Sequence, residues 1–391
     1  MSGQLQGSAR TRVATLVAMM MLVHMAFTGG RIAFSLYALQ LQASALQVGM
    51  IVSCLSIIPV VVSVHLGRWT DRVGVARPAL ISTTFSALGV ALPVLHPSIA
   101  MLCAASMVLG TAFMLLHIAV NNAVGHAVTA DTRTQAFTWL AVAFSVSSTF
   151  GPVVAGYAID HVGYSNALLV LAIFPLLPLL TMLVKPVPKD GAGRAVEPPA
   201  DTHVLDLLRN RPLRAVFIAS VLINVSWDMF TFMVPIHTSR IGFSASQVGL
   251  VMGSFGVATF VVRASIPWLV RRANEWQMLS MSLGIAALSY FLFPLTSLFG
   301  PLLAIAFVLG LGLGSAQPMV LSLIHRTAPA GRTGEAIGVR TSFLNLSQVL
   351  LPLAVGGMSA ASGVVPAFWL LAVLVGCGSW FTKRQNLPLR D

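Results

Sequence analysis

Long apolar stretches alternate with short polar links along almost the whole chain. A membrane-spanning helix needs about 20 mostly apolar residues, and these stretches have that length. Twelve of them can be delimited, at residues 13–40, 47–66, 78–95, 98–122, 136–159, 166–184, 213–238, 247–269, 276–295, 301–324, 336–358 and 364–381. We therefore predict an all-α membrane protein with twelve transmembrane helices, six in each half.

The two halves repeat one another at a shift of 200 positions. Ser44–Met50 returns as Ser244–Leu250 with five identical residues, and the register continues through Val108–Gly110 and Val308–Gly310. Two parallel repeats of membrane-length segments are typical of secondary transporters, whose site lies between the halves. We predict one six-helix bundle at residues 1–184 and a second at 213–391, joined by a cytoplasmic linker at 185–212.

Two helix starts can be read within this repeat. Ser44 with Gln47, and Ser244 with Gln247, have the form of a capping box, in which hydroxyl and amide satisfy the free N–H groups of a first turn. The spacing predicts that the second and eighth spans begin there, at the outer side of the membrane.

Composition and charge exclude a soluble protein. Hydrophobic residues make up 57% of the chain and charged residues 9%, so a soluble domain of this size would lack a polar surface. The net charge of +12 does not indicate nucleic acid, because 20 of the 23 Lys and Arg lie in the tails or in and beside the links after even-numbered spans. By the positive-inside rule both termini are cytoplasmic, and we expect a bacterial inner-membrane protein.

The three cysteines lie within apolar stretches and form no CxxC pair. We therefore expect no disulfide, metal site or cofactor. Helix breakers are frequent inside the spans, among them Gly151-Pro152, Gly156 and Pro352. They indicate either close helix packing or bending points for a moving gate, and the sequence supports both interpretations.

The link between the second and third spans reads GRWTDRVGVAR, from Gly67 to Arg77. It resembles the G-x-x-x-D-R-x-G-[RK]-[RK] loop of the major facilitator superfamily. Gly67, Asp71, Arg72 and Gly74 match, and the basic arm is reduced to Arg77. Together with twelve spans and an internal repeat, the resemblance implies the fold of that superfamily and transport by alternating access.

The resemblance also implies a cytoplasmic latch. In the family, the carboxylate at the place of Asp71 sits against the start of the eleventh span, because a helix N-terminus carries free N–H groups and partial positive charge. In this chain that start carries Glu335, and Arg340 follows in the next turn.

A second resemblance concerns the direction of transport. Gly151–Gly156 is similar to the G-P-x-x-G-G core found in the family's drug–proton exchangers, which favours export. The arginine that many exporters carry in the fourth span is missing, since Ala104–Met107 stands there. This absence counts against the standard layout for proton exchange.

Ionisable groups at membrane depth are costly and are candidates for function. Asp228 is the one carboxylate placed well inside a span, and Arg31 lies at comparable depth in the first span. We hypothesise that they form an ion pair or share a charged solute. A static structural pair is the alternative.

Two further pairs are equivalent under the 200-residue shift. His117 corresponds to Gln317, and the histidine either relays protons or binds a neighbouring carbonyl. His24 corresponds to Asn224, and these side chains either line a cavity or join helices by hydrogen bonds.

We therefore predict a monomeric secondary transporter that exports a small amphipathic or drug-like solute in exchange for protons, with no catalytic residues. The alternative is proton-coupled uptake of an organic anion, whose carboxylate would bind Arg31. An intramembrane enzyme is disfavoured because the chain has no H-E-x-x-H or G-x-S-x-G string. A sensor that no longer transports is also compatible with the sequence.

Overall fold

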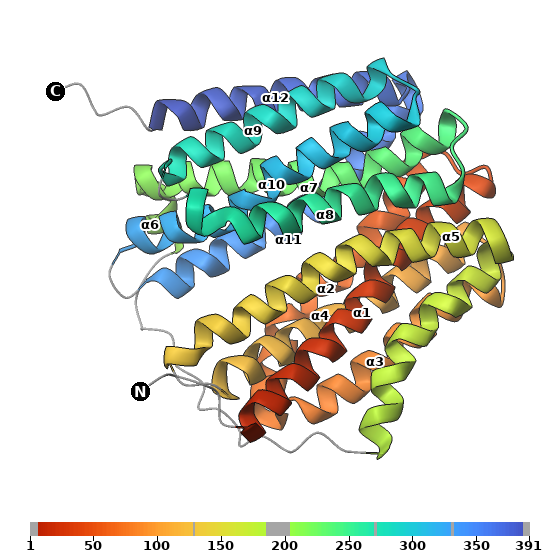
Figure 1. Ribbon diagram of the computed structural model, residues 1–391, viewed down its shortest axis with the longest axis horizontal. Coiled ribbons are helices and arrows are strands. Elements are labelled where there is room, and N and C mark those ends of the chain that lie inside the picture. The colour runs from red at the N-terminus through yellow and green to blue at the C-terminus, as the bar shows by residue number, and fades with distance from the viewer. Residues whose placement is uncertain (1–6, 128–129, 185–203, 270–271, 330–331, 386–391) are drawn as a thin grey trace. The chain divides into compact units, whose positions relative to one another are not determined.

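The computed structural model describes residues 7–127, 130–184, 204–269, 272–329 and 332–385, and every regular element within these ranges is helical (Figure 1). The first half contains α1 (Gly7–Gln40), α2 (Ala45–Val73), α3 (Ala76–Ala91), the 3₁₀ turn η1 (Leu92–Val94), α4 (Ile99–Ala127) and α5 (Ala130–Val184). The second contains α6 (Val204–Arg209), α7 (Arg211–Arg240), α8 (Ala245–Leu269), α9 (Glu275–Leu292), η2 (Phe293–Leu295), α10 (Phe299–Thr327), α11 (Thr333–Ser362) and α12 (Val364–Gln385).

α5 contains two spans. Its 55 residues would form a straight helix about 80 Å long, far more than the roughly 30 Å of a bilayer core. Gly163 has φ 79° and ψ 170°, which is not helical, and glycine adopts such a φ without steric cost. Figure 1 shows the chain reversing there, between a yellow and a yellow-green arm.

Ten helices of the described residues are long and apolar enough to cross a membrane. α5 counts once in that number although it holds two spans, and α3 has 16 residues and is continued by η1. Each of the twelve predicted spans therefore corresponds to a helical segment at the expected place.

The chain divides into two compact units. Unit 1 comprises Met1–Ala43, Met50–Glu197 and Ser244–Gly253, and unit 2 comprises Ser44–Gly49, Pro198–Phe243 and Ser254–Asp391. Each unit draws most of its residues from one half of the chain and a short segment from the other, and the two short segments are equivalent in the repeat. The first turn of α2 belongs to unit 2, and the first turns of α8 belong to unit 1. The bundle boundaries at 184 and 213 stay a prediction.

Both predicted capping boxes are confirmed. The backbone N–H of Ser44 donates to Gln47 Oε1 at 2.8 Å, and that of Gln47 donates to Ser44 Oγ at 3.3 Å. Ser244 and Gln247 make the same two bonds, at 3.0 and 3.3 Å. α2 and α8 accordingly begin where the sequence places their first turns.

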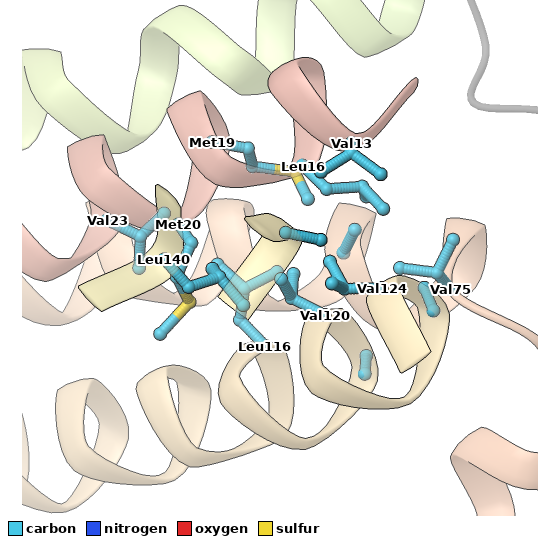
Figure 2. Close-up of a cluster of buried hydrophobic side chains, with 14 of the residues drawn as sticks. Val13, Leu16, Met19, Met20, Val23, Val75, Leu116, Val120, Val124 and Leu140 are labelled. Atoms are coloured by element: carbon cyan, nitrogen blue, oxygen red, sulfur yellow. The ribbon is translucent and has the colours of Figure 1, made fainter. Parts of the chain in front are cut away.

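The core of unit 1 lies where α1 packs on α4 and α5 (Figure 2). Val13, Leu16, Met20 and Val23 recur at helical spacing along α1 and are almost completely buried. Leu140 of α5 is buried in the same cluster. This packing fixes α1 and α5 side by side, and both helices carry predicted site residues.

In unit 2, the glycines of α10 are packing positions. Gly310 and Gly314 face α8, whereas Gly312 faces α9. A Cβ added at Gly310 would lie 2.5 Å from Phe255 O, and one at Gly312 would lie 2.9 Å from Ile285 Cγ2. α10 is helical throughout, so these residues bring three helices close together without breaking one.

Candidate functional site

His24 of α1 is joined to α5 through Ser147. His24 Nδ1 lies 2.5 Å from Ser147 Oγ, and that hydroxyl donates to Ala143 O at 2.8 Å. In the tautomer that carries its hydrogen on Nδ1, His24 donates to Ser147 Oγ while that hydroxyl donates to Ala143 O. Thr28, one turn along α1, donates to Ser147 O at 3.1 Å.

Aromatic rings surround this histidine. We define the aromatic–histidine cluster as the five half-buried residues His24, Phe27, Phe113, His117 and Phe144. The rings of Phe27 and Phe113 stack at 4.3 Å, and His24 meets the edge of Phe144 at 4.8 Å. His117 lies 5.8 Å from Phe113, so the structure brings the two predicted histidines into one cluster in unit 1.

Sequence reasoning missed the three phenylalanines of this cluster. Phe27 follows His24 by three positions and Phe113 precedes His117 by four, which places each pair on one face of its helix. That spacing was the available signal. Arg31 lies one turn beyond Phe27 and is half-buried, and its carbonyl accepts from Ser35 Oγ at 2.9 Å.

Asp228 of α7 is the corresponding polar centre of unit 2. Only 4% of the residue is exposed, and its Oδ2 accepts from Asn224 Nδ2 at 2.7 Å. A carboxylate in such a place is costly unless it is hydrogen-bonded. The structure thus joins two predicted residues, Asn224 and Asp228, into one group that occupies the positions equivalent to His24 and Thr28.

Aromatic side chains flank the carboxylate group on α7. Trp227 and Phe230 both pack on Phe255 of α8, with ring centroids 4.7 and 4.3 Å apart. The hydroxyl of Tyr290, a fully buried residue of α9, donates to Ser226 O. These contacts hold α7 against α8 and α9 and fix the backbone on both sides of Asp228.

The remaining predicted site residues make no contact with the Asn224–Asp228 group that the structure describes within unit 2. Arg31 belongs to unit 1 and Asp228 to unit 2, so their interaction stays a prediction. Gln317, on α10, is exposed and stands apart from the Asn224–Asp228 group in the contacts of the described residues. Among these residues, no three His, Cys, Asp or Glu side chains come close enough together to hold a metal ion.

The loop expected to act as a cytoplasmic latch is a tight turn. α2 ends at Val73, and Gly74 has φ 72°, which explains the glycine at this place. Asn122 of α4 donates to Asp71 Oδ1 at 2.7 Å, a partner that the sequence did not indicate. Gly67 has nothing within 4 Å of an added Cβ.

Arg68, Arg72 and Arg77 of this loop are exposed. At the start of α11, Arg332 binds Glu335 through two hydrogen bonds of 2.7 Å each. Arg340 is buried, and its Nε donates to Ser220 Oγ of α7 at 2.5 Å. Arg340 therefore joins α11 to α7 inside unit 2, and the latch itself stays a prediction.

The predicted bending residues of α5 lie at close helix contacts. α5 is helical through Gly151 and Pro152, and its one non-helical residue is Gly163. A Cβ at Gly151 would lie 2.8 Å from Met25 O of α1. Bending at Gly151, Pro152, Gly156 and Pro352 stays a prediction.

Two curated proteins are similar to the chain over most of its length. Multidrug resistance protein 1 of Bacillus subtilis (strain 168) is 21% identical over 354 residues, 89% of this chain and 90% of that protein. The class D tetracycline resistance protein of Salmonella ordonez is 25% identical over 321 residues, 78% of each chain.

Solved structures share the fold. A POT family transporter in complex with a thioalcohol-conjugated peptide superposes with a TM-score of 0.75 at 13% identity over 96% of both chains. A mutant of the nucleoside transporter NupG gives 0.77 at 13% identity over 96% of this chain and 100% of that one. These matches confirm the predicted all-helical fold. The model of the Major Facilitator Superfamily matches residues 16–352 and 276–388, and the chain belongs to that superfamily.

Proposed function

We propose that this secondary transporter exports a small, amphipathic, drug-like solute in exchange for protons. As a member of the superfamily it moves a small molecule across a membrane and is not an enzyme. The observation that carries the proposal is the buried Asp228 carboxylate with its Asn224 partner at 2.7 Å. Similarity to a multidrug resistance protein and to a tetracycline resistance protein supports the outward direction.

Asp228 is suited to proton coupling because its charge is held away from water. A proton would cancel the charge that burial penalises, and the neutral carboxyl could still exchange hydrogen bonds with the Asn224 amide. In an exchange cycle the solute and the proton would occupy this group in turn. Arg31 would bias the competition by stabilising the ionised form if the halves bring it close.

The aromatic–histidine cluster would supply the apolar part of the binding site. Stacked rings favour a flat aromatic solute, and half-buried rings leave surface for such a contact. His24 adds a polar contact that can form hydrogen bonds. A solute with an aromatic body and a polar or charged end would meet both chemistries.

Charge placement supports an orientation with both termini and the 185–212 linker in the cytoplasm of a bacterial inner membrane. In that orientation the α2 and α8 starts face outward. Uptake of an organic anion is the alternative function, and it would use Arg31 of α1 to bind the carboxylate. The two functions differ in the direction of solute movement relative to protons.

The test uses everted vesicles that have been acidified inside and contain a pH-sensitive dye. Ethidium or tetracycline added outside should release protons and restore dye fluorescence when the wild-type protein is present. Asp228→Asn should abolish the response, whereas Asp206→Asn, which changes an exposed carboxylate of α6, should leave it unchanged. Further loss of dye fluorescence on addition of an organic acid, with protons and solute entering the vesicle together, would replace export by uptake.

A further inference from the structure

Asp160, at the outer end of the first arm of α5, binds the start of α8. Its Oδ1 accepts from the backbone N–H of Ala245 at 3.0 Å, and its Oδ2 accepts from that of Ser246 at 2.7 Å. Both sides of this contact belong to unit 1. A carboxylate that accepts two N–H bonds at a helix N-terminus is stabilised by hydrogen bonding and by the helix dipole together.

This contact completes the cap of α8. The N–H of Gln247 is bonded to the Ser244 hydroxyl, and the N–H of Ser244 is bonded to Gln247 Oε1. Asp160 accepts from the two N–H groups between them, so all four free donors of the helix start have acceptors. The capping box therefore provides acceptors for two of these N–H groups, and Asp160 of α5 provides acceptors for the other two.

The backbones of α5 and α8 touch beneath the carboxylate. A Cβ added at Gly156, one turn before Asp160, would overlap Ala245 O and lie 3.1 Å from Ser246 Cα. Deeper along the same seam, a Cβ at Gly249 would lie 2.5 Å from Pro152 O. This close approach brings Asp160 within reach of the α8 donors.

Comparison of the two repeats shows that the close helix approach occurs in both, whereas the bonded carboxylate occurs only at the start of α8. Unit 2 has an equivalent close approach, in which a Cβ at Gly356 would lie 2.7 Å from Ala45 O at the start of α2. The residue equivalent to Asp160 is Ala360, which offers no acceptor. The start of α8 is thus bonded by a charged group from α5, and the start of α2 is packed on α11 without one.

We propose that Asp160 is an outer latch that holds the end of α8 on α5 and must release it when the transporter opens outward. α8 belongs to unit 1 up to Gly253 and to unit 2 from Ser254, so the bond lies on a helix that passes from one unit to the other. The proposal rests on alternating access alone and is independent of the solute, the proton and the direction of transport. The latch biases the resting protein against the outward-open state.

The test measures outward opening by labelling a covered residue. Val153 of α5 faces α8, since its Cγ2 would lie 2.6 Å from a Cβ at Gly253. Val153→Cys, in a protein whose Cys54, Cys103 and Cys377 are replaced by Ser, is labelled in intact cells with a membrane-impermeant maleimide. Loss of a helix-terminal charge contact shifts such an equilibrium about 5- to 30-fold, and Asp160→Asn should raise the labelling rate by that factor.

Two matched variants separate a latch from a purely structural cap. Ala360→Asp should build the missing bond at the start of α2 and lower Val153→Cys labelling, and the double variant Asp160→Asn/Ala360→Asp should return toward the parent rate. His161→Ala, an exposed change in the same turn, should have no effect.

All variants are first shown to elute as single species in size-exclusion chromatography, and Asp160→Glu, which keeps the charge, should raise labelling less than Asp160→Asn. If Asp160→Asn does not fold, Ala360→Asp with Asp160 intact carries the test, and unchanged labelling by that variant would overturn the proposal. A folded Asp160→Asn protein that labels within twofold of its parent would overturn the proposal. An increase with Asp160→Glu equal to that with Asp160→Asn would overturn it as well, because charge would then not be the cause.

Discussion

Gly151→Ala should weaken the packing of α5 on α1. The added Cβ would overlap Thr28 Oγ1 and lie 2.8 Å from Met25 O and 3.1 Å from Gly29 N. Two of these three atoms are backbone, so a change of rotamer cannot relieve the contact. Overpacking costs about 1–3 kcal/mol, whereas alanine gains about 0.5–1 kcal/mol over glycine within a helix. Because the clash is with backbone, the net expectation is a loss of about 1–2.5 kcal/mol of unfolding free energy.

The assay is thermal unfolding of the purified protein in detergent, with Gly338→Ala as the matched control. Gly338 of α11 has nothing within 4 Å of an added Cβ, so its alanine variant should unfold at the same or a higher temperature. Pro152→Ala, with Gly151 kept, tests bending separately, because a required bend would lower transport without lowering the unfolding temperature. A Gly151→Ala protein as stable as the wild type would refute the packing argument.

Three shorter predictions follow from the same geometry and charge pattern. A reporter active only outside the cytoplasm should be silent when fused after Arg194 and active when fused after Ser44; the reverse would overturn the orientation. Asp71→Asn should favour the inward-facing state and lower labelling of a cysteine at the outer end of α7; unchanged labelling would remove the cytoplasmic latch. Asn224→Leu should lower the unfolding free energy by about 1.5–3 kcal/mol, since Asp228 loses its amide donor; an unchanged unfolding temperature would contradict this.

Much of the fold could be predicted because membrane crossing leaves a strong pattern in sequence. Span length, the 200-residue repeat and the two capping boxes depend on local or periodic features, and the structure has them at the expected places. The exchange of segments between units was not predictable in this way. It depends on the close approach of neighbouring helices at Gly156 and Gly356. The sequence alone does not show which residue packs against a given glycine.

The candidate site was predicted in part. Depth in a span identified Asp228, and the repeat identified Asn224 as the equivalent of His24. The hydrogen bond between Asn224 and Asp228 was not predicted. The aromatic–histidine cluster was missed because phenylalanine is ordinary in apolar spans and gains meaning only from neighbours on other helices. Asp160 was missed because it lies just beyond a predicted span, where the free energy of placing a carboxylate is small and its position alone does not indicate a function. Arg340 was placed by its neighbours in sequence, whereas its partner, Ser220, lies 120 positions away.

The central claim is that Asp228 carries the coupled proton, and solute transport by Asp228→Asn in proteoliposomes tests it most directly. The variant should lose accumulation driven by a proton gradient while keeping exchange of labelled for unlabelled solute, because exchange needs no net proton movement. Asp206→Asn should retain both activities. Full gradient-driven accumulation by Asp228→Asn would contradict the account. The coupled proton would then have to be carried by another group, and His117 would be the first candidate.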